Sequence, residues 1–186
     1  MRAEKHWRLL PFQSCTRRAI AAENGPVILV GHSYGGVVIT EAGNDPEVSG
    51  LVYVAAFAPD AGESIPDISK PFPPPVGPTM AAPVGDGFLL LSPAGVETAF
   101  AQDLTDEEKS LLVAVQPQTS ASIFAAKPTK AAWHDKPNWY IVASNDNMIN
   151  PEHEKHMAKL MNATTIALPS SHVAMLSHPQ RSRQGH

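Results

Sequence analysis

The sequence predicts an α/β fold, an open and mostly parallel sheet with a helical lid inserted into it. Continuous apolar runs of four or five residues recur at 27–30, 51–55 and 139–143, and turn and helix signals follow them. Such runs are typical of parallel strands that are buried on both faces. Prolines gather between residues 60 and 140, and this concentration marks a region built differently from its flanks.

Length and composition limit the class of protein. The chain has 186 residues, so we expect residues 1–186 to form one domain with a single core. A formal net charge of −4 argues against nucleic-acid binding, and 43% hydrophobic residues argue against global disorder. Residues 1–12 lack the apolar stretch of a signal peptide, and no apolar run approaches the ~20 residues of a membrane span. The single cysteine, Cys15, cannot form an intrachain disulfide, so we expect a cytoplasmic protein. From the charge and the apolar runs we expect neither a nucleic-acid nor a membrane partner.

The first elements form a strand–helix–strand unit with a right-handed crossover. The leading helix has Ser14 as its expected cap and ends at the stop signal Asn24-Gly25-Pro26. The elements expected, in order, are a helix over 13–24, a strand over 27–30, a helix over 37–43 and a strand over 51–55.

Residues 60–132 interrupt this pattern and form the expected lid. Seven prolines between residues 66 and 83 forbid long regular elements there. Helices are expected over Pro93–Ala101, capped by Ser92, and over Asp106–Val115, where Thr105 and Glu108 make a capping box. A short helix is also expected over 121–126. An irregular surface excursion is the alternative to a lid over a pocket.

The parallel pattern then resumes. A strand over 139–143 ends in a turn that contains Asp146, and a helix over 151–161 follows with Pro151 at its first position. A last strand over 164–168 precedes Ser170-Ser171-His172.

The segment Gly31-His32-Ser33-Tyr34-Gly35 has the G-x-S-x-G pattern between a buried strand and a helix. In this context the serine lies on a strained turn with its hydroxyl projecting, and Gly31 and Gly35 are expected to provide the room. The backbone N–H of Tyr34 would lie at the helix N-terminus, where it can stabilise an oxyanion. A glycine-rich turn with an inert serine is the alternative.

Asp146 and His172 are the candidates for the acid and the base that a serine nucleophile needs. Each follows its own strand, where catalytic groups gather in open parallel sheets. The chain order Ser33, Asp146, His172 is the order expected of this nucleophile pattern. Asp60, beyond the second strand, is the second candidate for the acid.

The other histidines do not predict a metal site. His153 and His156 stand three apart on a helix, but no third ligand has suitable spacing, so we expect no metal and no cofactor. His32 is expected to point away from the base position and to be structural.

With these residues laid out, the chain resembles the α/β-hydrolase family over residues 13 to about 179. The segments 27–36, 51–60, 139–151 and 170–179 look like the bacterial small-esterase branch, which carries a helical cap. The resemblance implies that Ser33 is the nucleophile, Asp146 the orienting acid, His172 the general base and residues 60–132 the cap. It implies no cofactor.

The departure from the family lies at the front of the chain. Members place strands before the nucleophile strand, and a loop there, usually with a His-Gly pair, donates the second oxyanion N–H. Residues 1–12 contain neither, so we expect an N-terminally incomplete sheet and impaired activity. We also expect the edge formed by residues 27–30 to favour self-association.

The expected function is a serine hydrolase of small ester or related acyl substrates, acting through an acyl-enzyme intermediate on a small-molecule acyl substrate. One alternative is a non-catalytic truncated remnant or binding protein with this fold. Another is a lyase that uses the same triad, which is less favoured because the lid offers no well-placed lysine.

Overall fold

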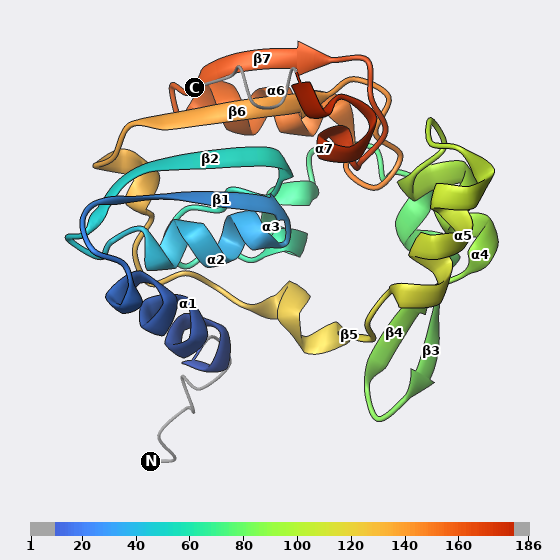
Figure 1. Cartoon of the computed structure of the whole chain (residues 1–186), viewed down its shortest axis with the longest axis horizontal. Helices are drawn as coiled ribbons and strands as arrows, with labels where there is room; N and C mark the ends of the chain where they lie inside the picture. The colour runs from blue at the N-terminus through green and yellow to red at the C-terminus, as the bar shows by residue number, and fades with distance from the viewer. Residues whose placement is uncertain (1–9, 181–186) are drawn as a thin grey trace.

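The computed structural model describes residues 10–180, and at its centre lies a four-stranded parallel sheet (Figure 1). The strand order is β1-β2-β6-β7. The expected fold class is confirmed. The first three strands of this sheet are one to four residues longer than the apolar runs that predicted them. The strands are β1 (Val27–Ser33), β2 (Val48–Ala56), β6 (Asn138–Ala143) and β7 (Thr164–Leu168). All pairs in this sheet are parallel, so the carboxyl ends of all four strands meet at one edge.

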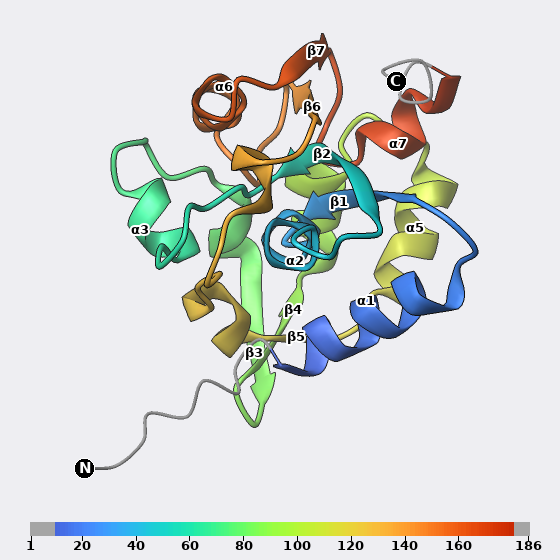
Figure 2. The same cartoon turned by 90° about the vertical axis from the view of Figure 1, so that its left-hand side faces the viewer.

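Helices cover the two faces of the sheet unequally. Helices α2 (Gly35–Ala42) and α6 (Pro151–Leu160) pack on one face, and the short α7 (Ala174–Ser177) lies on the other (Figure 2). Alternate residues of β2 point to opposite faces. Leu51 and Tyr53 therefore belong to the larger core under α2 and α6, whereas Val52 and Val54 contact the smaller cluster around Ala174.

Helix α1 (Leu10–Ala22) precedes the sheet and contacts α2. It begins before the expected start at residue 13, so Ser14 lies inside the helix and is not its cap. The helix ends at Ala22, two residues before the expected end at residue 24, and the expected stop signal follows it, where Gly25 takes a positive φ of 119°.

The segment between β2 and β6 holds helices, as expected, and also a small sheet that the sequence analysis did not predict. It holds α3 (Ile65–Ser69), α4 (Pro93–Gly95), α5 (Asp106–Val115) and several single turns, one of them a π-helical turn over Val96–Phe100. It also holds an antiparallel sheet of β3 (Ala81–Gly85), β4 (Phe88–Leu91) and β5 (Thr119–Ser120). We call residues 60–132 the cap.

A local turn signal explains the small sheet. Asp86 and Gly87 link β3 to β4, and their φ angles are 49° and 78°. Two successive positive φ values suit the two-residue hairpin turns for which Asp-Gly is strongly preferred. Pro83 lies on the edge strand β3, where a missing N–H is tolerated. The proline-rich composition masked this hairpin in the sequence.

The expected helix caps of the cap segment are confirmed. The Thr105 hydroxyl accepts from the N–H of Glu108, and the Glu108 carboxylate accepts from the N–H of Thr105. The Ser92 hydroxyl accepts from the N–H of Gly95, one turn further on. These reciprocal bonds satisfy N–H groups that the first turn of a helix leaves unpaired.

The chain leaves and rejoins the sheet at neighbouring points, and polar contacts hold the two ends of the cap together. The N–H of Gly62 donates to the carbonyl of Pro128, 2.8 Å away. The buried Glu41 of α2 accepts from the N–H and the hydroxyl of Thr129, at 2.6 and 2.7 Å. The cap is therefore anchored to the core helix α2 where it returns.

Strand β1 forms an edge of the sheet within residues 10–180, since β2 is its one neighbour there. Ile28 and Val30 are 52% and 60% exposed on this strand.

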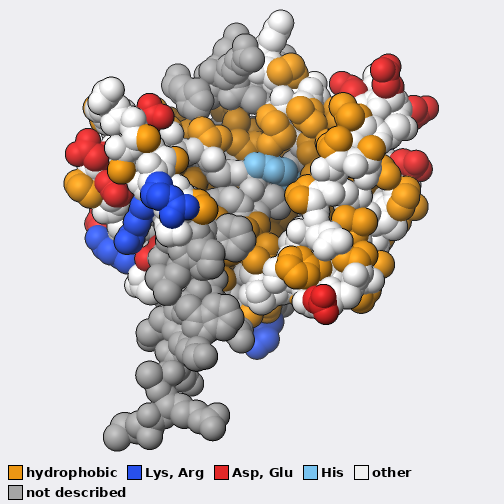
Figure 3. Space-filling model, turned by 60° about the horizontal axis from the view of Figure 1, so that its bottom comes forward, with side chains coloured by type: hydrophobic (Ala, Val, Ile, Leu, Met, Phe, Trp, Pro, Cys, Tyr) orange, Lys and Arg blue, Asp and Glu red, His pale blue; other side chains and the backbone are white. Residues whose placement is uncertain are grey.

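The face at the bottom of Figure 1 is brought forward in Figure 3, where apolar side chains gather around a histidine. Over the same described range, no helix is both long enough and apolar enough to cross a membrane.

Candidate active site

Ser33 lies on a sharp turn between β1 and α2. Its φ is 54°, in the left-handed region that costs a non-glycine residue roughly 1–2 kcal/mol. Such strain is typical of functional positions. The turn needs glycine at two places: a Cβ at Gly31 would lie 2.6 Å from the Gly35 carbonyl oxygen, and one at Gly36 would collide with the carbonyl oxygen of Phe57. A Cβ at Gly35 would meet open space. The second position that requires glycine is therefore Gly36, whereas the sequence analysis expected Gly35.

Tyr34 directly precedes the first residue of α2 and already has helical backbone angles, φ −57° and ψ −26°. Its N–H therefore belongs to the first turn of that helix, where the backbone dipoles favour negative charge. This is the place at which the sequence analysis expects an oxyanion donor.

Asp146 and His172 form a buried pair. Asp146 Oδ2 lies 2.6 Å from His172 Nδ1, and the two side chains are 0% and 1% exposed. The other oxygen, Asp146 Oδ1, accepts from the N–H groups of Met148 and Ile149 at 2.6 and 3.0 Å. The carboxylate is thus fixed on both sides, and it holds one nitrogen of the imidazole.

The pair keeps its acid ionised. Burial by itself would raise the pKa of Asp146, but the charge that His172 carries when it is protonated and the hydrogen bonds from His172 and the Ile149 N–H together lower it. An ionised acceptor at Nδ1 orients the imidazole and leaves Nε2 as the nitrogen that can take up a proton, as a general base requires.

His32 contacts His172, and the expectation that it points away from the position of the base is wrong. Its Nε2 lies 2.8 Å from the carbonyl oxygen of His172, and the two rings are 4.6 Å apart between centroids. Burial, with a smaller contribution from the charge of His172, lowers the pKa of His32 to about 3. His32 is therefore neutral and donates from Nε2, which ties the residue before Ser33 to the loop of His172.

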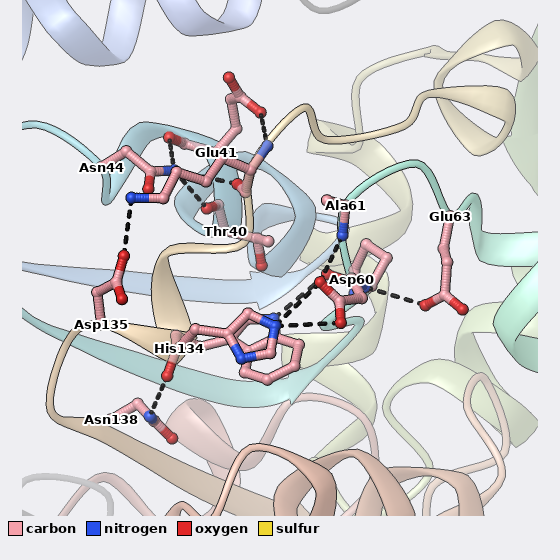
Figure 4. A network of polar contacts seen from close by, with 12 residues as sticks. Thr40, Glu41, Asn44, Asp60, Ala61, Glu63, His134, Asp135 and Asn138 are labelled. Atoms are coloured by element: carbon pink, nitrogen blue, oxygen red, sulfur yellow. Dashed lines mark hydrogen bonds and ion pairs between the residues drawn. The ribbon is translucent and has the colours of Figure 1, made fainter.

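Asp60, the second candidate for the acid, belongs to a different cluster. Both of its carboxylate oxygens lie 3.1 Å from His134 Nε2, near the return point of the cap (Figure 4). The side chains are 40% and 53% exposed. The geometry brings Asp146, and not Asp60, to His172.

His153 and His156 do not assemble a metal site. His153 is buried and stacks on Phe72 of the cap, with ring centroids 4.4 Å apart. Burial lowers the pKa of His153 to about 4. Among the described residues there is no group of three side chains that could hold a metal ion.

Three residues at the site were missed by the sequence analysis. The Phe100 ring lies 5.3 Å from the His172 ring, and Asp103 and Glu154 contact the segments around Asp146 and His172. Glu154 is 0% exposed, and its Oε2 accepts from the N–H of Ala143 at 2.9 Å. Burial and the negative charge of Asp146 raise the pKa of Glu154 to about 10, so this carboxyl group is neutral. No periodicity or motif marks these residues, because they reach the site from separate elements.

Comparison with known proteins identifies the family of this chain. A sequence model described as the alpha/beta hydrolase family matches residues 5–183. The chain belongs to the α/β-hydrolase family. The resemblance stated from the sequence is thereby confirmed.

Individual relatives of this α/β hydrolase are distant or matched in part. The carbendazim hydrolyzing esterase of Nocardioides sp. (strain SG-4G) is 51% identical over 47 residues, which make up 24% of this chain and 19% of that esterase. A pyrethroid hydrolase from Sphingobium faniae JZ-2 has a TM-score of 0.78 at 22% identity, covering 95% of this chain and 75% of that chain. Polyneuridine aldehyde esterase has a TM-score of 0.76 at 19% identity, covering 92% and 75%. The identities of 22% and 19% to these two solved structures show that the fold is shared.

Proposed function

We propose that this α/β hydrolase cleaves small carboxylic esters through a Ser33–His172–Asp146 triad. The observation that carries the proposal is the buried 2.6 Å pair of Asp146 and His172, bonded through His32 to the strand that ends at Ser33. The strained φ of Ser33 adds independent support. The esterase names of its relatives point to the same chemistry.

The proposed reaction has two halves. The Ser33 hydroxyl attacks the ester carbonyl while His172 takes its proton, and the alcohol leaves with that proton. Water then attacks the acyl-enzyme with His172 again as the base, which releases the acid and restores Ser33. Asp146 stays ionised throughout and holds the imidazole. The chemistry requires no cofactor.

The Tyr34 N–H is the oxyanion donor that we assign within residues 10–180. Family members use two donors, and loss of one costs on the order of 10²-fold to 10³-fold in turnover. We therefore propose that the chain as given turns over slowly.

The substrate class follows from the cap. Phe100 and Leu91 pack with the buried cluster around Val173, the residue after His172, so apolar cap side chains lie close to the base. We propose a small ester with an apolar acyl or alcohol portion. A cytoplasmic location also belongs to the proposal, because a single cysteine suits a reducing compartment.

A fluorophosphonate tests the nucleophile directly. We expect the wild-type protein to gain one covalent adduct on Ser33, located by intact mass and peptide mapping, and Ser33→Ala to gain none. Circular dichroism of both proteins controls for folding. Absence of the adduct on folded wild-type protein would contradict the proposal and favour a non-catalytic binding role.

We also propose that the edge of β1 supports self-association. Ile28 and Val30 expose apolar surface on β1, which has one neighbouring strand within residues 10–180. The open edge of such a strand is a template for pairing with a second chain. Light scattering should show dimers or larger species, and Val30→Lys should shift them toward monomer. A monodisperse wild-type monomer at high concentration would refute this proposal.

A further inference from the structure

One short segment of the cap forms hydrogen bonds with the loop of Asp146 and with the loop of His172. This segment is Thr98–Asp103, and we name it the clamp. We propose that the clamp is a positioning element, in which Asp103 and Gln102 hold the backbone beside His172 and Asp146, so that the placement of the cap sets the alignment of the triad. This inference rests on the proposed function.

Asp103 holds the base loop. Its Oδ2 accepts from the N–H of Ser171, the residue before His172, at 2.7 Å. Burial works against ionisation of Asp103, but hydrogen bonds from Ser171 outweigh it and lower the pKa of the carboxyl group. The acceptor is therefore charged at neutral pH, and a charge-assisted hydrogen bond is roughly twice as strong as a neutral one.

The residue after His172 is also held by the cap, through apolar packing. Val173 follows His172 and is 3% exposed. It packs in one cluster with Val96, Ala101 and Leu104 of the cap. His172 thus lies between a residue hydrogen-bonded to the clamp and a residue packed against the cap.

Gln102 and Thr98 hold the acid loop. Gln102 Nε2 donates to the carbonyl of Asn145, the residue before Asp146, at 2.6 Å. Asn147, the residue after Asp146, donates from Nδ2 to the carbonyl of Thr98 at 3.3 Å. The clamp therefore contacts the residues on both sides of Asp146.

The two loops are also bonded to each other, so they respond together. The N–H of Asn145 donates to the carbonyl of Ser170 at 3.0 Å. A displacement of the clamp would shift the Asp146 loop and the His172 loop at once relative to Ser33, which belongs to β1. A misplacement of about 1 Å costs on the order of 10²-fold in rate when it alters the attack geometry.

Kinetics of four single variants test the clamp. We expect Asp103→Ala to lower kcat for a p-nitrophenyl ester by roughly 10-fold to 10²-fold per titrated serine, with KM changed little, because alignment and not binding is lost. Asp103→Asn should recover most of the rate, since its amide oxygen still accepts from Ser171. Gln102→Ala should lower kcat in the same way through the acid loop. Glu107→Ala, an exposed carboxylate on α5, is the matched control and should behave as wild type.

Two results would overturn the proposal. One is an active wild-type enzyme with Asp103→Ala and Gln102→Ala both within about twofold of its kcat, well short of the change that lost alignment predicts. The other is a fall in kcat that Asp103→Asn reproduces in full, because the acceptor would then not be the cause. Counting active serines by fluorophosphonate labelling separates lost alignment from lost folded protein.

Hydrogen exchange tests the clamp without any turnover. We expect the Asp103→Ala and Gln102→Ala double variant to exchange faster at 144–148 and at 170–173, and to leave the strand peptide at 48–56 unchanged. Unchanged exchange at both loops would overturn the clamp. A wild-type protein that neither labels at Ser33 nor turns over ester would refute the proposed function alone, and exchange would still decide the clamp.

Discussion

Two aspartate–histidine pairs in this protein have the same chemistry and opposite surroundings. Asp146 and His172 are 2.6 Å apart and essentially unexposed, whereas Asp60 and His134 are 3.1 Å apart and roughly half exposed. Each aspartate follows a strand of the parallel sheet. The attraction between two charges at about 4 Å is worth ~1 kcal/mol in water and ~4 kcal/mol in a protein-like medium. The buried pair can therefore hold an imidazole in one orientation, whereas the exposed pair contributes little to the stability of the fold.

The buried pair needs compensation that the exposed pair does not need. Removing a charge from water is costly unless hydrogen bonds satisfy it. Asp146 receives two backbone N–H groups as well as His172. Its neighbour Glu154 stays neutral, which avoids a second negative charge in the same pocket. The comparison teaches that position in the core, and not the pairing itself, makes an aspartate a candidate for catalysis.

The largest expected effect separates the two aspartates. Asp146→Asn should cut ester turnover by up to ~10⁴-fold, because the imidazole loses its ionised acceptor, while the asparagine oxygen can still accept from Met148 and Ile149. Asp60→Asn should leave turnover nearly unchanged. Steady-state kinetics and a thermal melt of both variants make the measurement. If Asp60→Asn is the damaging change, the acid is wrongly assigned.

A smaller effect concerns Glu154, whose neutral state protects the buried pair. With a pKa of about 10 in the folded protein, Glu154 is protonated at neutral pH, whereas the unfolded chain carries it ionised. The folded state therefore binds one more proton. The stability that this group contributes is complete below the ordinary glutamate pKa. It is lost as pH rises from there to the folded pKa of about 10, at about 1.4 kcal/mol per pH unit.

Glu154→Gln should remove that dependence, because an amide does not ionise. We expect the variant to be more stable than wild type at pH 8, with the difference shrinking toward pH 5, and to retain ester turnover. Urea unfolding at three pH values measures it. Glu152→Gln, exposed on the same helix, is the control and should follow the wild-type curve. Parallel curves for Glu154→Gln and wild type would mean that Glu154 is ionised in the folded state.

Much of the candidate site could be predicted from local patterns. Ser33 follows a continuous apolar run and precedes a helix, and the positive φ found there agrees with that reading. Asp146 and His172 each follow a strand, so the common edge of a parallel sheet brings them together. Capping at Thr105 and Glu108 was equally predictable, because the bonds join residues three apart. The assignment of these residues to catalysis stays a prediction until the serine is labelled.

The remaining features depend on contacts between distant parts of the chain. The bond from Ser171 to Asp103 spans 68 residues, and that from His32 to His172 spans 140. The sheet in the cap was masked by its prolines, although Asp86-Gly87 gave a signal that could have been used.

The sequence by itself determined the four strands of the parallel sheet, the helix caps at Ser92 and Thr105, and the order in which the three candidate residues follow one another. These properties depend on apolar periodicity, glycine and capping groups, which act over a few residues. Only the tertiary structure decided which aspartate meets His172, that Glu154 stays neutral and that the cap holds both loops. Burial and hydrogen-bond partners set the ionisation and orientation of a side chain, and packing between distant segments creates both.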